Sequence, residues 1–157
     1  MATTHDATAQ GPFVGIRAPY GGPGAFAVVK LHIDMAAVTT ALAATVDGSQ
    51  SDVLQVWDIP VGTCILGCLL KVTKAEGTTC TCTVGTNAGA NVYIAAGTDL
   101  NSTSTIAGTA AGDTYGTARL VNASADTLDV LFATAADIDL CVFDIYVYCV
   151  FNYDVWE

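Results

Sequence analysis

The stretch "LCVFDIYVYCVF", residues 140–151, decides the expected fold of this chain. Apolar residues recur in it at every second position: Cys141, Phe143, Ile145, Val147, Cys149 and Phe151. A period of two is the side-chain period of a β-strand, with one face buried and the other turned outward. At ~3.3 Å per residue the segment would span about 40 Å, which is long for a strand. It therefore predicts a long strand against a core, with Asp144, Tyr146 and Tyr148 on its outer face.

The same alternation recurs along most of the chain. We predict strands at 26–35, 64–74, 78–85, 117–121 and 126–133, at the short apolar run 53–59, and, as shorter candidates, at 92–95 and 103–107. Turn-forming residues separate them. Residues 35–46 mix helix-favouring and strand-favouring residues, so we expect irregular chain or a short helix there. Closely spaced short strands without a long helix predict an all-β fold, namely an antiparallel β-sandwich, jelly-roll-like, of about eight strands.

The first 25 residues have a different composition from the rest. They are rich in proline and glycine, which interrupt helices and strands. We therefore predict that residues 1–25 form an extended or flexible N-terminal arm without a regular element, able to bridge to a neighbour. Residues 26–157 are predicted to form one β-sandwich domain.

Composition excludes several classes of partner. Charged residues make up only 13% of the 157 residues, and five basic residues face fifteen acidic ones, for a net charge of −10. Such a chain repels phosphate backbones, so no nucleic-acid partner is expected. The start of the chain has no signal-peptide pattern, and no uncharged run is typical of a membrane helix. We expect no membrane partner and synthesis in the cytoplasm.

Six cysteines raise the question of metal or redox chemistry. In "TTCTCTVG", residues 78–85, Cys80 and Cys82 alternate with threonines. This spacing is open to half a metal site, a redox pair or one face of a strand. Free cysteine behaves as a small hydrophobic residue, and paired C-x-x-C ligands are absent, so we favour a core role without metal or cofactor. In residues 64–74, the alternation likewise predicts Cys64 and Cys68 inward and Ile65 and Leu69 outward.

No catalytic constellation is evident. His5 lies in the predicted arm, and His32 lies between Lys30 and Asp34 on a polar strand face, where we expect an ordinary surface or interface residue. The segment "DGSQSD", residues 47–52, is a candidate calcium loop, but local turn hydrogen bonds explain it more simply. We therefore predict that the protein is not an enzyme.

The outer faces of several predicted strands carry threonine, tyrosine and aliphatic residues rather than charges. Weakly polar faces of this kind commonly mark protein interfaces, although the second sheet of a sandwich would also cover such a face. We predict that aromatic and aliphatic residues of the arm, the last strand and the tail bind a partner protein. They are Phe13, Ile16, Tyr20, Tyr146, Tyr148, Tyr153 and Trp156.

Four turn-and-strand motifs carry a resemblance to a known family. They are "IPVGT" (Ile59–Thr63), "TKAEG" (Thr73–Gly77), "TTCTCTVG" (Thr78–Gly85) and "AAGTDL" (Ala95–Leu100). With their flanking strands, residues 53–151 resemble the capsid decoration, or cement, proteins of tailed bacteriophages. The resemblance implies a β-rich homo-oligomer, commonly a trimer, that binds the major capsid protein on the outer capsid surface of the virion and stabilises the shell. The high cysteine content departs from that pattern.

The main alternative is a phage tail or fibre module that binds a host glycan. Such a module needs exposed aromatic residues, for which Trp57, Tyr93 and Tyr115 are the candidates. A glycan hydrolase would instead need two converging carboxylates. Binding to host cells rather than to capsids would favour the first alternative, and turnover of a polysaccharide would favour the second.

Overall fold

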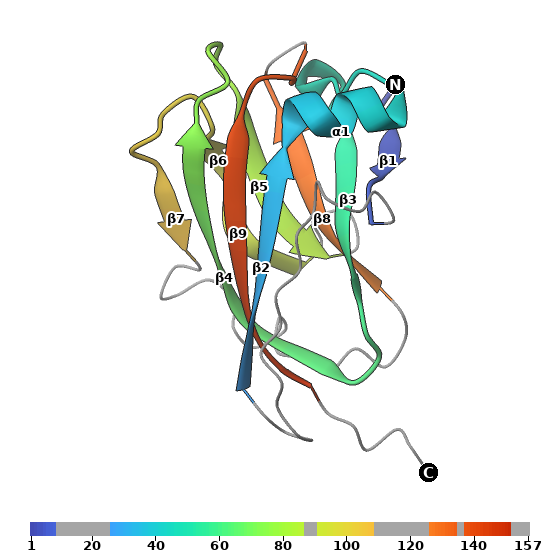
Figure 1. The fold of residues 1–157 in the computed structure, drawn as a ribbon, viewed down its shortest axis with the longest axis vertical. Helices are drawn as coiled ribbons and strands as arrows, with labels where there is room; N and C mark the ends of the chain where they lie inside the picture. Colours follow the sequence, from blue (N-terminus) through green and yellow to red (C-terminus); the bar gives the residue numbers. More distant parts are fainter. Residues whose placement is uncertain (9–25, 87–90, 109–125, 135–136, 152–157) are drawn as a thin grey trace.

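Two β-sheets pack face to face in the computed structural model, which describes residues 1–8, 26–86, 91–108, 126–134 and 137–151. One sheet has the order β1-β3-β8-β5-β6 and the other β2-β9-β4-β7 (Figure 1). The strands are β1 (Thr4–Asp6), β2 (Phe26–Asp34), β3 (Val53–Ile59), β4 (Thr63–Lys74), β5 (Thr81–Thr86), β6 (Asn91–Asp99), β7 (Ile106–Gly108), β8 (Asp126–Ala133) and β9 (Val142–Phe151). The all-β sandwich is therefore confirmed.

The strand order, which the sequence does not reveal, is that of a jelly roll. From β2 onward the chain pairs like one long folded hairpin: β2 with β9, β3 with β8, β4 with β7, and β5 with β6, all antiparallel. Eight strands rolled in this way form the two sheets of a jelly roll. The ninth strand, β1, is an addition at the edge of the larger sheet, where it pairs parallel with β3.

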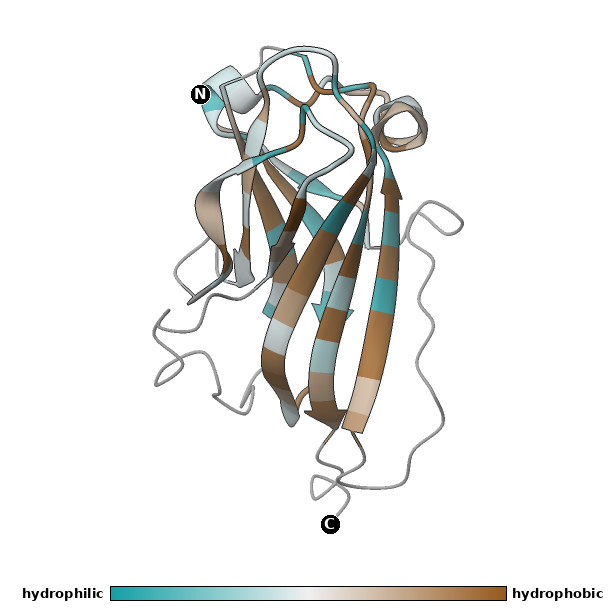
Figure 2. Cartoon of the chain, turned by 90° about the vertical axis from the view of Figure 1, so that its left-hand side faces the viewer, coloured by the Kyte–Doolittle hydropathy of each residue, from teal (hydrophilic) through white to brown (hydrophobic). Residues whose placement is uncertain are grey.

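The core lies between the sheets and is built by the period-two pattern. The inward positions of β9, from Phe143 to Cys149, are fully buried, as are Leu31 and Ile33 of β2 and Phe132 of β8. Figure 2 shows the resulting alternation of hydrophobic and hydrophilic positions along the strands. Leu128 and Val130 of β8 are fully buried as well.

A β-bulge in β4 makes one predicted strand face wrong. The pairing with β9 shifts between Ile65 and Gly67, so that one extra residue is inserted into β4. Ile65 is therefore buried opposite Cys149, whereas Cys64 lies half-buried on the outer face beside Val150. After the bulge, Cys68 points inward as predicted.

The ambiguous segment 35–46 contains a short helix, α1 (Met35–Leu42). The Asp34 side chain caps it by accepting a hydrogen bond from the backbone N–H of Ala36 at 3.1 Å. The helix ends at Ala43, which takes the left-handed conformation with φ 50°. Asp34 thus ends β2 and starts the helix over one end of the sandwich (Figure 1).

The shorter strand predictions are right in place but not in extent. The candidate at 92–95 is the middle of β6, Asn91–Asp99, and the candidate at 103–107 overlaps β7, Ile106–Gly108. The predicted strand at 117–121 lies outside the described residues.

The prediction that residues 1–25 form no regular element is wrong for their first part. Thr4–Asp6 form β1, and Ala7 is fully buried in the core cluster. The edge of β3 offers unpaired backbone groups there, and their hydrogen bonding outweighs the weak strand propensity of this segment. Residues 9–25 lie outside the described residues, so the remainder of the arm, and the boundary of the domain at residue 26, stay predictions.

Candidate partner-binding face

The outer surface of the β2-β9-β4-β7 sheet is the place where predicted interface residues come together. We call this surface the tyrosine face. It consists of Phe26, Val28, Lys30, His32, Asp144, Tyr146, Tyr148, Val150, Cys64, Leu69, Lys71 and Ile106. Figure 1 views this sheet from outside. Among the described residues, no helix or strand covers this face of the sheet.

Cross-strand pairing arranges this face in rows. One row runs from His32 through Asp144 and Lys71 to Ile106, and it contains most of the charge. The next row runs from Lys30 through Tyr146 to Leu69. Towards the other end the rows become aromatic and aliphatic. The face therefore grades from a charged end to an apolar end along the strands.

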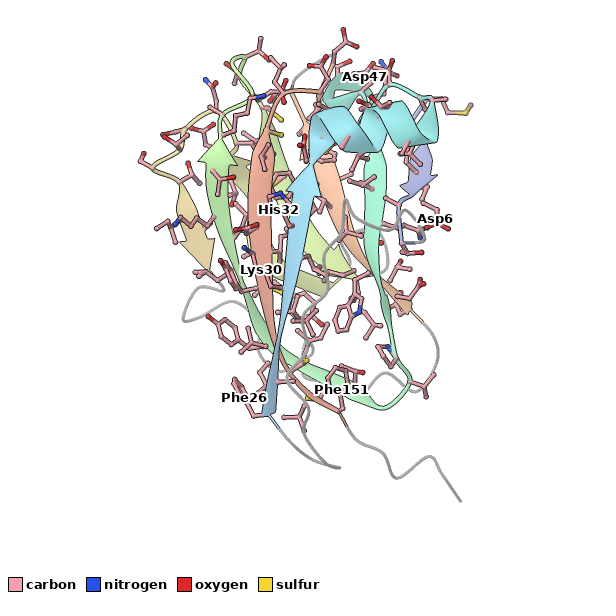
Figure 3. All side chains as sticks on the ribbon, viewed as in Figure 1. Asp6, Phe26, Lys30, His32, Asp47 and Phe151 are labelled. Atoms are coloured by element: carbon pink, nitrogen blue, oxygen red, sulfur yellow. The ribbon has the colours of Figure 1, made fainter. Side chains whose placement is uncertain are left out.

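Asp144 organises the charged end. Its carboxylate lies 2.8 Å from Nζ of Lys30 and 2.7 Å from Nδ1 of His32. Burial acts to raise the pKa of Asp144, but hydrogen bonds from Lys30 and His32 outweigh it and hold the pKa below its ordinary value. The hydrogen bond with Asp144 in turn raises the pKa of Lys30. The carboxylate is thus charged at neutral pH and fixes two side chains that extend toward solvent (Figure 3).

The two tyrosines are held by neighbours on β2. Nζ of Lys30 lies 5.5 Å from the ring centroid of Tyr146, within the range of a cation–π contact. The ring of Tyr148 stacks on Phe26 with centroids 6.2 Å apart and planes 24° apart. Phe26 is 58% exposed at the end of β2 (Figure 3). Aromatic side chains that are already fixed lose little conformational entropy on binding a partner.

Charge is distributed unevenly between the two sheets. The three lysines in the described part of the chain are Lys30, Lys71 and Lys74, and all lie on β2 or β4. The larger sheet holds acidic residues but no lysine or arginine within its described strands. The tyrosine face therefore carries two of these lysines, Lys30 and Lys71, against one aspartate, Asp144, in a strongly acidic chain.

Two of the seven predicted contact residues lie on this face. Tyr146 and Tyr148 are half-buried on β9. The other five predicted residues, Phe13, Ile16, Tyr20, Tyr153 and Trp156, lie outside the described residues, so their role stays a prediction. Sequence reasoning missed Phe26, and it placed Lys30 and His32 on a polar face without finding their partner. The strand register that joins them to Asp144 would have been needed.

Two of the three aromatic residues proposed for a glycan site are buried. Trp57 and Tyr93 are each only 5% exposed, because both point into the sandwich. Tyr115 lies outside the described residues. Two of the three candidates are therefore wrong as stacking platforms for a sugar.

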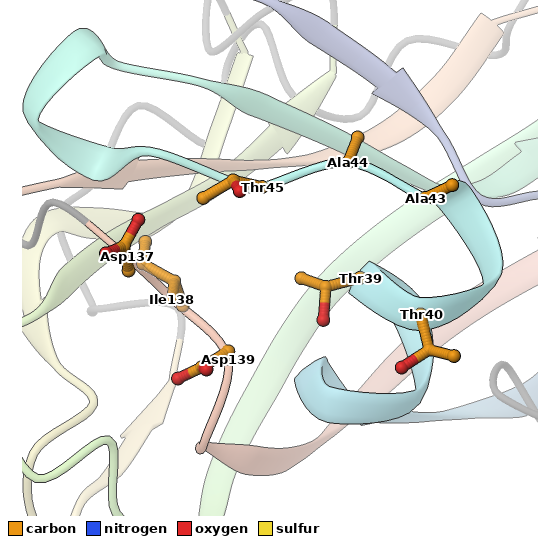
Figure 4. Close-up of a pocket in the computed structure, with 8 residues that line it drawn as sticks. All are labelled: Thr39, Thr40, Ala43, Ala44, Thr45, Asp137, Ile138 and Asp139. Carbon is orange, nitrogen blue, oxygen red and sulfur yellow. The ribbon is translucent and has the colours of Figure 1, made fainter.

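A hollow of about 480 Å³ lies between α1 and the loop before β9, and it is lined by threonines, alanines and a short acidic stretch (Figure 4). Asp137 and Asp139 are exposed at its rim. Within the described ranges no group of three or more histidine, cysteine, aspartate or glutamate side chains is placed to hold a metal ion. The hollow is a wide depression between loops rather than a built ligand site.

The segment 47–52 contains a one-turn 3-10 helix, Gly48–Gln50, rather than a simple turn, and its hydrogen bonds are local, as expected. The Asp47 side chain accepts hydrogen bonds from the backbone N–H of Ser49 at 2.8 Å and from its hydroxyl at 2.6 Å. The Asp52 side chain accepts one from the backbone N–H of Asp47 at 2.9 Å. These carboxylate oxygens point to protein donors, which is the arrangement of a local turn.

The cysteines are thiols, and five of the six are buried. Burial raises the pKa of Cys80 to about 12 and that of Cys149 to about 11, and it also raises the pKa of Cys68, Cys82 and Cys141. A thiol must lose its proton to act as a nucleophile or metal ligand. The core role predicted for Cys80 and Cys82 is therefore confirmed by their position, and the one for Cys64 is wrong.

Comparison with known proteins gives a likeness of fold. No family model matches the chain, and no curated protein matches it. A chain from the structure of the capsid of Ralstonia phage GP4 superposes with a TM-score of 0.59 at 15% sequence identity. The match covers 96% of this chain and 99% of that one, so the two folds correspond over their whole lengths. Among the described residues, no helix is long and apolar enough to cross a membrane.

Proposed function

We propose that this chain is a structural protein of a tailed-phage head that decorates the outer surface of the capsid. The observation that carries the proposal is the match, over nearly the whole of both chains, with a chain from a phage capsid. Because the coverage is mutual, the two matched chains are of similar size, and the likeness concerns nearly all of each. The sequence motifs that resemble decoration proteins support the same assignment.

In this proposal the protein acts by binding alone. It binds the major capsid protein, and it is a homo-oligomer, which we expect to be a trimer. Contacts made only with the assembled shell stabilise that shell by mass action, since a ligand that prefers one state shifts the equilibrium toward it. The protein is made in the host cytoplasm and ends in the virion, on the outside of the capsid.

The tyrosine face is the contact surface in this proposal. Its aromatic end provides fixed rings, and its charged end provides the lysines of a chain that is otherwise acidic. Tyrosine and other aromatic residues are enriched at the centres of protein interfaces, and charged groups at the rim set orientation. The Asp144 cluster would thus orient the partner, and Tyr146 and Tyr148 would supply most of the affinity.

The test is reconstitution of attachment on phage heads assembled without this protein. Purified chain should bind such heads at saturating stoichiometry and appear as outer density in electron cryo-microscopy. Replacing both Tyr146 and Tyr148 with alanine should weaken binding at least tenfold, while Tyr146→Phe should bind nearly as the native chain does. Asp144→Asn tests the charged end of the face in the same assay. Its matched control is Asp58→Asn, because Asp58 is exposed on the other sheet. Failure of the native chain to bind any head would refute the function, whereas native binding by the double variant would refute only the contact surface.

A further inference from the structure

The edge of β3 binds the N-terminal strand through backbone hydrogen bonds of the kind that bind an extended peptide. The backbone N–H of Val53 donates to the carbonyl of Thr3 at 2.9 Å, and the N–H of Ala7 donates to the carbonyl of Gln55 at 3.0 Å. Thr4 to Asp6 pair in parallel register with residues 53 to 55. This is strand addition at a sheet edge, in which main-chain hydrogen bonds hold the added segment.

A buried carboxylate at the start of β3 completes the site. Asp52 is 3% exposed, and its side chain accepts a hydrogen bond from the backbone N–H of Thr3 at 2.6 Å. Its other oxygen lies 3.1 Å from Nε2 of His5. The Met1 ammonium donates to the Gln50 side chain at 2.6 Å. Asp52 and Gln50 therefore contact the main chain, the His5 imidazole and the terminal amine of this segment. Among residues 1–8, only Ala7 is fully buried.

We propose that the β3 edge with Asp52 is a strand-docking site that takes the first eight residues of a second copy of this chain. The docked strand is joined to the domain only through residues 9–25, and that connection ends at Phe26, at the far end of β2 (Figure 1). At ~3.3 Å per residue, those 17 residues reach up to about 56 Å. A domain of this length has a radius of gyration of about 15 Å, so the arm reaches the site of an adjacent copy as well as its own.

Exchange costs little because the same contacts form in either case. The hydrogen bonds by which Asp52, Val53 and Gln55 hold the N-terminal strand involve only residues 1–8 on the strand's side, whichever chain provides them. The balance between the two arrangements is then set by connector entropy and by the local concentration of neighbours. In a closed oligomer that concentration is high, and exchanged strands link the copies without any additional apolar surface. This inference concerns the protein by itself and holds with or without the proposed capsid role.

The test uses full-length chains that carry Cys64→Ser, since the other five native thiols are buried in the folded protein. A disulfide between the introduced cysteines can then form only between copies. Asp6 and Gln55 are Cα partners across β1 and β3. Asp6→Cys chains and Gln55→Cys chains are mixed, unfolded, refolded together and oxidised. We expect a disulfide-linked dimer containing one chain of each kind, and none when Asp6→Cys is mixed with Thr73→Cys, which is exposed on the other sheet. Absence of the mixed dimer, when the Asp6→Cys/Gln55→Cys double variant closes within one chain, would overturn the proposal.

A second measurement covers the case in which a cysteine variant does not fold. A fluorescent peptide of residues 1–8 is titrated into the native chain and into Asp52→Asn, and its anisotropy is recorded. Saturable binding to the native chain that weakens at least tenfold with Asp52→Asn is the expected result. No saturable binding to the native chain would contradict the proposal. Because no phage head is present in either experiment, neither outcome bears on the proposed function.

Discussion

Two aspartates of this protein, Asp52 and Asp144, are similarly buried but differ in the groups that they bind. Both are nearly inaccessible, at 3% and 6% exposure, and each contacts a histidine. Asp52 also accepts hydrogen bonds from two backbone N–H groups, those of Thr3 and Asp47. Among the described residues, Asp144 accepts only from side chains that are themselves 39% and 45% exposed.

The difference teaches how one residue type serves two purposes. A carboxylate that satisfies backbone donors fixes the path of the chain, because removing it leaves buried N–H groups without partners. A carboxylate that satisfies exposed side chains fixes the pattern of a surface, because those side chains can turn to water instead. Asp52 should therefore control folding of the N-terminal strand, and Asp144 should control what the tyrosine face binds.

The largest expected effect is on Asp52. Asp52→Ala should lower the free energy of unfolding by about 2 kcal/mol, since it leaves the part-buried N–H groups of Thr3 and Asp47 without their acceptor. Urea unfolding of the purified protein measures this. Asp58→Ala, an exposed position on the same strand, is the control and should change stability by less than about 0.5 kcal/mol. Equal losses of unfolding free energy in both variants would show that Asp52 does not fix the path of the chain.

Acid should act through both aspartates. Burial raises the pKa of Asp52, but hydrogen bonds from the N–H groups of Asp47 and Thr3 and from His5 outweigh it, so the pKa in the folded state lies below its ordinary value. The pKa of Asp144 is lowered in the same direction. A lowered carboxyl pKa contributes stability that is present above the unfolded-state pKa and is lost as pH falls through the folded-state pKa.

Unfolding free energy should therefore be flat near neutral pH and fall below the ordinary aspartate pKa. Urea unfolding at a series of pH values gives the curve. Asp52→Asn should reduce the acid slope more than Asp144→Asn does, because its carboxylate is bound by backbone groups rather than by mobile side chains. A slope that is the same in native and Asp52→Asn proteins would contradict this assignment.

A smaller effect is expected for the stability of Asp144→Asn. Ion pairs with exposed partners contribute up to about 1 kcal/mol, and salt screens them. We expect a loss of about 1 kcal/mol or less at low salt, shrinking at high salt, and measured by thermal unfolding at two ionic strengths. A loss of stability as large as that of Asp52→Ala would show that Asp144 also fixes the path of the chain.

The sequence predicts the sheets much better than it predicts these two sites. Inward residues such as Leu31, Phe132 and Ile145 follow from period two alone, because burial of one strand face is a local property. Asp144 is visible as an interruption of the pattern, but its partners on β2 are 112 and 114 residues away in sequence. Which strands pair is set by the jelly-roll topology, and no short segment encodes that.

Two further features escape the sequence for definite physical reasons. The bulge that exchanges the faces of Cys64 and Ile65 depends on pairing with β9, since alternation within β4 continues without interruption in the sequence. The N-terminal strand forms because a sheet edge and a buried carboxylate receive it. Proline and glycine in the following residues suggested an arm throughout, and the pattern of the first eight residues alone gave no contrary signal.

The last prediction concerns two buried thiols of the core, which are uncharged. Cys80 and Cys82 are 0% and 1% exposed in the core. Cys80→Val and Cys82→Val should each change the unfolding free energy by less than about 1.5 kcal/mol, because valine is close in size and equally apolar. Urea unfolding measures this, with the half-buried Cys64→Val as the matched control on the outer face. Release of a metal ion from the native protein but not from the variants would contradict the core role. A small loss in both would show that, unlike Asp52, these side chains stabilise the fold by filling space.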